Sequence, residues 1–571
     1  MHRGFWTFNA AGAFSTVENF ARGVVQTYQQ GFGPKYNGYR TTEVNLYVQD
    51  QFRVSPTFSL DLGARFEYVG NPTEVNNLVD LGYGADSYIE PRFGFAYAPN
   101  WQDGLLGAIA GEQGNLVVRG GYGIFHGRIF QSIFAQGGVT VRFNPPQGAT
   151  LTFANPEMSV ANPLGNYVFQ PGPPTAQVVL VSPDPGLRNP YTQQWNLTLE
   201  RALPWDSGLS ISYLGNRGIG FIQYDARNRA QFPVTSTVPT TYAGTANFPG
   251  VRFDQIDPNL FNANPAPGFI SLSQLRTNPR RPDGRYGAIF GISNNAWTYY
   301  NALQAFWTKR LSQGLSAQLS YTWSKNIDTG SEATFVGAGD TNFLISETLG
   351  PKGNRGPSRL DQPQRFVASY TYQFPFGKGQ SGFVGHLIGG REMNGTVTLG
   401  YGNPVTVVLG YDMNADGIGG DRPYLADPSV LFRSMDNARV NPETGRQFSM
   451  DQVSTSAFFP NASNVPNRSY PFLPGTGAVG SLGRNTFRLH GQKNFDMAFV
   501  KNTKIFGKDR GHELQFRAEI YNLFNRVQFG APNLTLIDTS VAGYRINPNF
   551  GQIRALNNTP RNMQMMLRYQ F

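Results

Sequence analysis

A cluster of oxygen-bearing side chains is the pattern in this sequence that most resembles a ligand site. Asp412, Asn414 and Asp416 stand at alternate positions before a glycine, and Asp421 follows two residues before the twelfth position counted from Asp412. Such spacing resembles the first half of a calcium-binding loop. The carboxylate expected at the twelfth position is replaced by Pro423, and an ordinary Asp/Asn/Gly turn would favour the same residues. The sequence therefore predicts either a calcium site or a simple turn, and no other cofactor is expected.

The remaining reactive residue types form no catalytic pattern. The chain has no cysteine, which excludes thiol nucleophiles, cysteine zinc sites and disulfides. Its histidines are isolated from one another in the sequence: His2, His126, His386, His490 and His512. No Gly-x-Ser-x-Gly elbow marks a nucleophilic serine. The glycines of residues 120–123 lack the lysine of a phosphate loop and instead predict a strand against which aromatic rings pack. We therefore expect a protein that is not an enzyme.

Composition favours a protein that crosses a membrane with strands. Aromatic residues make up 14% of the 571 residues, hydrophobic residues only 40%, and the mean hydropathy is −0.34. Strands with one face in lipid and the other in water have this balance, and no apolar run reaches the ~20 residues of a membrane helix. The net charge of +10 comes from scattered basic residues, which predicts contact with outer-membrane lipid and lipopolysaccharide rather than with nucleic acid.

The last residues show the strand pattern most clearly. In residues 561–571, Met563, Met565, Leu567, Tyr569 and Phe571 alternate with mostly polar residues. This period-2 pattern and length match a tilted membrane strand. An aromatic residue at the end of the apolar face resembles the signal read by the barrel-assembly machinery. Tyr569 and Phe571 are therefore the predicted assembly signal.

The same alternation recurs along the chain and defines the expected fold. Short turns join strands in pairs, while long segments such as 218–298, 325–364 and 524–560 separate the pairs. A β-propeller or β-helix would need a regular repeat, and none is present. The sequence predicts an all-β, antiparallel transmembrane β-barrel with short periplasmic turns and long extracellular loops. Residue ranges with the strand pattern include 44–54, 58–68, 195–201, 209–213, 299–310, 315–324, 366–374, 396–401, 495–505 and 514–523.

Several motifs resemble those of TonB-dependent outer-membrane receptors. The hairpin formed by LYVQDQFRV (46–54) and LDLGARFEY (60–68) resembles a mid-barrel hairpin of the family, and FRAEIYNLFN (516–525) its penultimate strand. NPYTQQWN (189–196) and YTWSK (321–325) are closer to the Oar-like receptors of the acidobacterial type. The motifs extend from about residue 40 to the C-terminus in the family's order.

This resemblance implies a barrel of 22 strands, an N-terminal plug and a box that contacts the TonB complex. About fourteen strand candidates are present, so residues 1–571 are expected to be the C-terminal part of such a barrel, without signal peptide, plug and first strands. The expected function is uptake of an unidentified bulky ligand across the bacterial outer membrane, coupled to TonB through the plug of the intact protein. The alternative is a structural or adhesive surface protein without active transport.

Overall fold

The chain was analysed as a computed structural model. The described residues are 4–9, 14–33, 38–77, 80–112, 114–129, 149–154, 178–229, 281–283, 286–331, 353–377, 380, 382–410, 421–423, 439–440, 447–448, 482–505, 511–538 and 545–571. Among them, no helix has the length and apolar character needed to cross a membrane.

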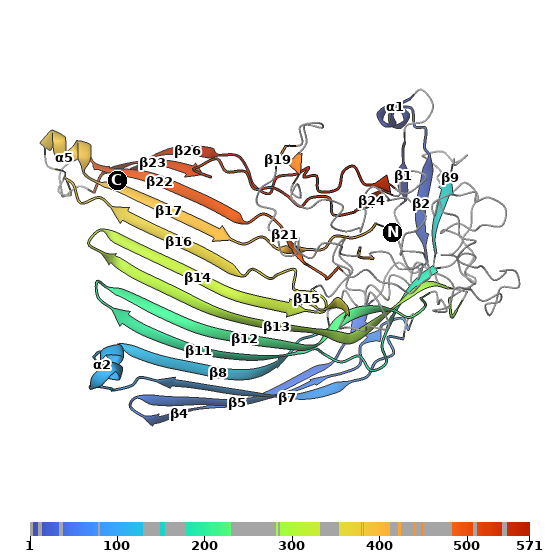
Figure 1. Cartoon of the computed structure of the whole chain (residues 1–571), viewed down its shortest axis with the longest axis horizontal. Helices are drawn as coiled ribbons and strands as arrows, with labels where there is room; N and C mark the ends of the chain where they lie inside the picture. Colours follow the sequence, from blue (N-terminus) through green and yellow to red (C-terminus); the bar gives the residue numbers. More distant parts are fainter. Residues whose placement is uncertain are drawn as a thin grey trace, which may run out of the picture.

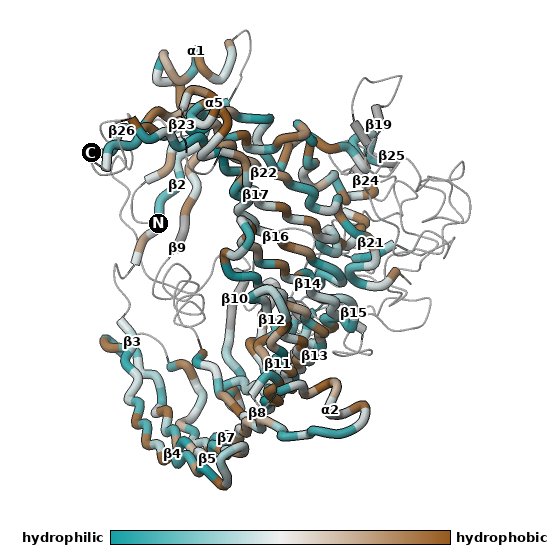
Figure 2. Tube along the Cα trace, turned by 90° about the vertical axis from the view of Figure 1, so that its left-hand side faces the viewer, coloured by the Kyte–Doolittle hydropathy of each residue, from teal (hydrophilic) through white to brown (hydrophobic). Residues whose placement is uncertain are grey.

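A 15-stranded sheet dominates the molecule and curves as in Figures 1 and 2. From one edge to the other its path runs β26 (Asn562–Gln570), β23 (Glu513–Tyr521), β22 (Gln492–Lys504), β17 (Arg391–Gly400), β16 (Gln364–Gln373), β14 (Leu315–Asp328), β13 (Tyr286–Ser312), β12 (Ser207–Ala226), β11 (Tyr191–Leu203), β8 (Leu116–His126), β7 (Asp86–Tyr97), β5 (Phe58–Val69) and β4 (Glu43–Ser55). Neighbours on this path are antiparallel. Two further strands join it, β15 (Gly356–Pro357) beside β14 and β10 (Val178–Pro183) parallel to β13.

The strand register sorts the side chains into an apolar face and a polar face. One row of paired positions across successive strands is entirely apolar: Phe58, Tyr97, Val118, Leu199, Ile211, Ala305, Tyr321, Phe366 and Leu399. The adjacent row is polar apart from one alanine: Ser59, Ala96, Arg119, Thr198, Ser212, Gln304, Thr322 and Arg365. Successive residues point to opposite sides of a strand, so this register gives the sheet one lipid-type and one water-type surface. The alternation is visible along the strands in Figure 2.

The two ends of the sheet carry different connections. At one end, short turns at 56–57, 204–206 and 313–314 join neighbouring strands, and two connections contain the helices α2 (Gly104–Ala110) and α5 (Gly382–Ile388). Long connections, such as 227–285 and 401–491, leave from the opposite end (Figure 1). We call these the turn end and the loop end.

Smaller elements surround the loop end. A three-stranded sheet joins β1 (Phe5–Thr7), β2 (Thr27–Phe32) and β9 (Ala149–Ala154), and α1 (Thr16–Ala21) lies near it (Figure 1). Short two-residue pairs are β3 (Tyr39–Arg40) with β6 (Thr73–Glu74), β18 (Pro404–Val405) with β21 (Phe487–Arg488), β19 (Arg439–Val440) with β20 (Gln447–Phe448), and β24 (Ile537–Asp538) with β25 (Arg545–Ile546). The sequence did not predict these elements.

The all-β antiparallel fold predicted from the sequence is confirmed, with differences in strand length. Strands β12 and β13 extend well beyond the predicted segments 209–213 and 299–310. Their loop-end halves pack around a cluster of buried apolar residues, which breaks the two-sided pattern. The cluster comprises Leu81, Ile129, Leu187, Ile222, Tyr224 and Ile292.

Pairing within the described residues runs from β26 to β4, and these two strands are not paired with each other. Most side chains of both strands are exposed on both faces.

Candidate functional site

Buried polar side chains clamp the bases of the long loops. We call this set the collar, and its members are Glu90, Asn228, Asp328, Asp361, Arg484, Arg488 and Asn522. Each is less than one tenth exposed, and each lies at or just beyond the loop end of a strand or in a segment packed there. Buried polar groups are stable only when hydrogen-bonded, so the partners of these residues determine how the loops begin.

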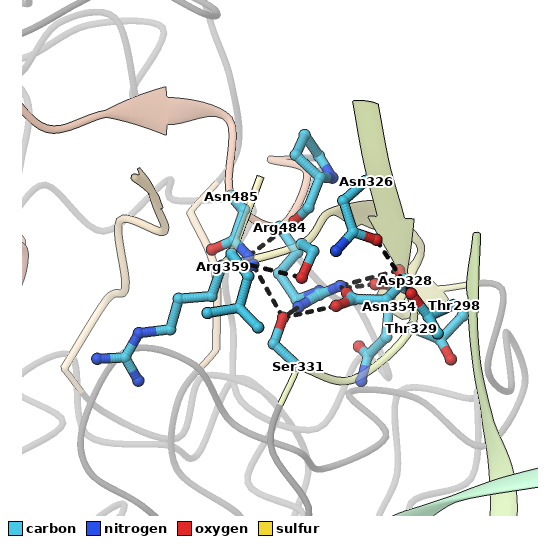
Figure 3. A network of polar contacts seen from close by, with 12 residues as sticks. Thr298, Asn326, Asp328, Thr329, Ser331, Asn354, Arg359, Arg484 and Asn485 are labelled. Atoms are coloured by element: carbon cyan, nitrogen blue, oxygen red, sulfur yellow. Dashed lines mark hydrogen bonds and ion pairs between the residues drawn. The ribbon is translucent and has the colours of Figure 1, made fainter. Parts of the chain in front are cut away.

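The ion pair between Arg484 and Asp328 is the centre of one clamp (Figure 3). Asp328 ends β14, whereas Arg484 lies just before β21, 156 residues later in the chain. The guanidinium also donates to the backbone oxygen of Asp328 at 2.9 Å, to that of Asn354 at 2.8 Å and to the Ser331 hydroxyl at 3.0 Å. One side chain therefore joins segments from two long loops to the end of a barrel strand.

A second clamp is centred on Arg488, which follows Arg484 closely in the sequence. Arg488 pairs with Asp361, whose side chain is 0% exposed, and donates to the backbone oxygen of Asp361 at 3.0 Å. The same carboxylate accepts the backbone N–H of Asn326 at 2.6 Å and lies 3.6 Å from the half-exposed Lys325 ammonium. The carboxylate is therefore compensated by two cations and a backbone donor, as a buried charge requires.

Arg422 lies close to these pairs but is poorly compensated. Its side chain donates to the backbone oxygen of Gly353 at 2.8 Å, while Nε and Nη1 have no hydrogen-bond partner within the described part of the chain. Burial lowers the pKa of its guanidinium to about 10; the positive charge of Arg484 acts in the same direction and the carboxylate of Asp421 opposes it. One buried cation beside the collar therefore carries a charge that is costly.

Asparagine side chains close two other loops. The Asn228 amide donates to the backbone oxygens of Asp283 and Gly287 at 2.8 Å, and its oxygen accepts the Asp283 N–H at 2.9 Å. Connection 227–285 is therefore fastened at its base. Asn522 adopts a positive φ of 53°. Its backbone N–H donates to Oδ1 of Asp496 at 2.8 Å, and its side-chain amide donates to the Arg526 backbone oxygen at 2.9 Å. Asparagine tolerates this left-handed conformation, which starts the last long loop.

Glu90 provides the corresponding clamp among the N-terminal strands. Its carboxylate accepts the backbone N–H of His126 at 2.6 Å and lies 3.2 Å from Nδ1 of the same histidine. Arg92 approaches the carboxylate at 3.2 Å. The His126 ring stacks on Tyr88, with ring centroids 3.9 Å apart. These contacts join β7 to the end of β8. His126 is therefore part of a packed polar cluster.

The polar face below the collar is hollowed. A groove with a cavity volume of about 450 Å³ runs across β14, β16, β17, β22 and β23. Its polar lining includes Gln318, Thr371, Asn394, Asp496 and Glu519. These groups can donate to or accept from a hydrated solute, which is the expected character of a conduit wall.

The predicted calcium loop is described only at one residue. Asp412, Asn414 and Asp416 lie outside the described residues, whereas Asp421 is buried and its backbone oxygen accepts the Leu409 N–H at 2.8 Å. Within the described part of the chain, no group of three or more His, Cys, Asp or Glu side chains could hold a metal ion. Calcium binding stays a prediction.

The predicted assembly residues lie at the turn end of β26. Tyr569 is half exposed and its hydroxyl is 2.7 Å from His512 Nδ1. Phe571 follows the strand with 88% of its surface exposed. The glycine strand at 120–123 also lies where expected, in β8: a Cβ on Gly120 would be 2.3 Å from the Phe95 ring. Glycine is therefore required there for the aromatic ring to pack.

Sequence reasoning missed most of the collar, although some of its signals were present. Asn522 lies within the motif at 516–525, directly after β23, and Asn189 in the motif at 189–196 donates its N–H to the Tyr88 hydroxyl at 3.1 Å. Ser324 in the motif at 321–325 donates to the Gln362 oxygen at 2.8 Å. Each of these polar residues stands at the loop end of a strand. Arg484 and Arg488 had no such signal, because their partners are far away in the sequence.

A protein-family model matches most of the chain. The model described as "Outer membrane beta barrel domain" matches residues 2–89 and 80–564. The chain belongs to this family. An outer membrane beta barrel domain lies in the bacterial outer membrane, so its apolar strand faces contact lipid.

Solved structures of outer-membrane proteins resemble the chain at low sequence identity. The outer membrane transporter YddB from Escherichia coli is 9% identical with a TM-score of 0.37, and the match covers 94% of this chain and 54% of that one. The ferric enterobactin receptor PfeA from Pseudomonas aeruginosa is 10% identical with a TM-score of 0.39, covering 92% and 44%. The pyoverdine receptor FpvA of that species is 10% identical with a TM-score of 0.37, covering 94% and 43%. This chain thus spans about half the length of these proteins or less. No curated protein sequence matches it.

Proposed function

We propose that this outer membrane beta barrel domain forms the wall and mouth of a receptor-type conduit for uptake of a bulky ligand. The observation that carries the proposal is the collar. Several long loops begin from one end of a two-faced sheet, and buried polar side chains fix their bases. Binding residues are commonly carried on loops that a rigid scaffold positions. The polar face beneath them, with its groove, supplies a path for a hydrated solute.

We also propose a branch of the receptors and an energy source for uptake. The motifs at 189–196 and 321–325 support an Oar-like, TonB-dependent receptor, in which coupling to the TonB complex would occur through the plug of the intact protein. The proposed role is that of a receptor and not of an enzyme.

Entry of a large polar antibiotic tests the conduit proposal. The full chain, directed to the outer membrane of a Gram-negative host, is expected to increase vancomycin susceptibility because ordinary porins exclude this molecule. Comparison of tonB⁺ and tonB⁻ hosts separates an energised conduit from a passive one. Unchanged susceptibility with a correctly inserted barrel would contradict the proposal. Loop-dependent attachment of such cells to surfaces would then favour the adhesive alternative.

We also propose that Tyr569 and Phe571 are the residues that the barrel-assembly machinery recognises. Both are aromatic and exposed on the apolar face at the turn end. Phe571→Ala is expected to lower the amount of heat-modifiable, folded protein in the outer membrane severalfold, and the matched control is Phe376→Ala, another exposed phenylalanine at the turn end. Equal yields of the two variants would contradict this assignment.

A further inference from the structure

The helix α2 presents apolar side chains to its surroundings at the turn end. Leu105 is 77% exposed and Ile109 is about half exposed, and a spacing of four residues places them on one side of a helix. Gly107 and Ala110 are buried on the other side. The helix therefore buries small residues on one side and leaves Leu105 and Ile109 uncovered on the other.

The helix α5 repeats this arrangement in the opposite part of the sheet. Phe383 is 83% exposed, and Val384, Leu387 and Ile388 are also exposed. None of the side chains of α5 is buried. Large apolar side chains are rarely clustered in contact with water, so such a patch indicates an interaction surface.

Cationic side chains of the barrel strands hold both helices in place. Arg201 of β11 donates to the backbone oxygens of Ala108 and Ile109 at the end of α2. Arg391, the first residue of β17, donates to the Leu387 oxygen of α5 at 3.1 Å, and Lys501 of β22 donates to the Gly389 oxygen just beyond it. These contacts satisfy helix carbonyls that otherwise lack partners. The exposed apolar side chains therefore lie on helices that these hydrogen bonds hold to the sheet.

The two helices lie at the same level but far apart around the sheet. The helix α2 connects β7 to β8 and α5 connects β16 to β17, with β11, β12, β13 and β14 in between. Figure 1 shows both helices at the turn end. Exposed aromatic residues Trp205 and Phe571 lie at this end as well. A flat surface meets all of these positions at once, whereas a single soluble partner would have to reach across the intervening strands.

We propose that α2 and α5 are interfacial anchors whose apolar side chains insert into the periplasmic leaflet of the outer membrane. The short turns of such barrels face the periplasm, and the anchors continue the apolar face that already contacts lipid. The boundary between phospholipid headgroups and acyl chains accommodates short apolar helices and aromatic side chains. The anchors thereby fix the depth and tilt of the barrel.

Site-directed spin labelling tests this proposal directly, because the chain contains no cysteine. Single variants Leu105→Cys and Phe383→Cys of the full chain would carry a nitroxide in phospholipid vesicles. The matched control is Gln102→Cys, an exposed polar position just before α2. Collision rates with oxygen, which concentrates in lipid, and with a water-soluble nickel chelate report the depth of each label.

The proposal requires labels at both helices to show a severalfold higher oxygen-to-nickel ratio than the control. Ratios equal to that of Gln102→Cys would place the helices in water and overturn the proposal. Labels protected from both reagents would indicate a protein partner or a second copy, which also overturns it. Heat-modifiable migration of each variant confirms that the barrel has folded before the ratio is measured.

Discussion

The loop end and the turn end of the sheet have opposite patterns of burial. At the loop end, charged residues such as Arg484 and Asp361 are enclosed by protein. At the turn end, Leu105, Phe383 and Phe571 are left uncovered. In a water-soluble domain both patterns would be unfavourable. Our proposal explains the exposed apolar side chains of the turn end by the lipid that covers them, whereas the buried charges of the loop end are stable because protein groups compensate them.

The contrast teaches that exposure has to be judged against the local solvent. A buried arginine in the collar is stabilising only where partners compensate its charge. An exposed phenylalanine at the turn end is stabilising only where lipid covers it. Substitutions that remove either the charge compensation at the loop end or the apolar side chains at the turn end therefore test the two ends separately.

Removing one partner of the central clamp has the largest expected effect. Arg484→Ala leaves the carboxylate of Asp328 buried without its cation, which costs about 3–5 kcal/mol in the free energy of unfolding. Urea unfolding of the barrel in phospholipid vesicles measures this loss, and limited proteolysis locates it at the loop end. A double variant that also carries Asp328→Leu should recover much of the stability, because no unpaired charge remains. A loss below about 1 kcal/mol would show that the pair is solvated.

The poorly compensated cation Arg422 gives an effect of opposite sign. Burial lowers the pKa of the Arg422 guanidinium to about 10, which corresponds to a cost of roughly 3 kcal/mol. Arg422→Met removes this cost and loses one hydrogen bond of about 1 kcal/mol. We expect the free energy of unfolding to rise by about 2 kcal/mol, in contrast to the loss caused by Arg484→Ala. Destabilisation by Arg422→Met would show that this charge has a partner.

The same residue predicts a dependence on alkaline pH. Below the folded pKa of about 10, both states hold the proton and the folded state carries the full cost. Above that value the folded chain loses the proton before the unfolded chain does, so the unfolded state binds more protons and the free energy of unfolding rises with pH. The stability difference between Arg422→Met and the native chain should therefore shrink between about pH 8 and about pH 11. A difference independent of pH would argue against a depressed pKa.

At the turn end a smaller effect is expected, and only in lipid. Phe383→Ser should lower the free energy of unfolding in phospholipid vesicles by about 1 kcal/mol, because an interfacial side chain gains part of the roughly 1.5–3 kcal/mol of full burial. Leu360→Ser is the control, since Leu360 is similarly exposed but lies at the loop end. Equal effects of the two substitutions would remove the distinction between the ends.

An exposed ion pair on the barrel wall should contribute least. Arg119 and Glu200 are 3.0 Å apart on β8 and β11, with about half of each side chain exposed. Arg119→Ala is expected to change the free energy of unfolding by less than about 1 kcal/mol, since water screens the pair. The urea experiment used for Arg484→Ala measures both variants, and a larger effect at Arg119 would show that the polar face is drier than its exposure indicates.

The strands of the barrel could be predicted from the sequence because their pattern is local. Alternation in residues 58–68 and 315–324 identifies both the strand and its lipid face, and the short turns fix the pairing. The loop-end halves of β12 and β13 escaped prediction because residues such as Ile222 and Ile292 enter an apolar cluster. Two-sided alternation fails where both faces of a strand meet protein.

The collar was largely unpredictable for a different reason. Arg484 and Asp328 stand far apart in the sequence, and the residues around each of them do not indicate which residue it pairs with. Asn522 was closer to prediction, since an asparagine at a strand end commonly adopts a positive φ. Long-range polar pairing needs the assembled fold, whereas local backbone preferences do not.

The clamp at Asn228 also has a consequence for the evolution of the domain. It closes connection 227–285 at its base, so an insertion, deletion or exchange above that point leaves the neighbouring strands unstrained. The entropic cost of lengthening an already closed loop grows only slowly with its length. The loops can therefore diversify one at a time, while the sheet below retains its register.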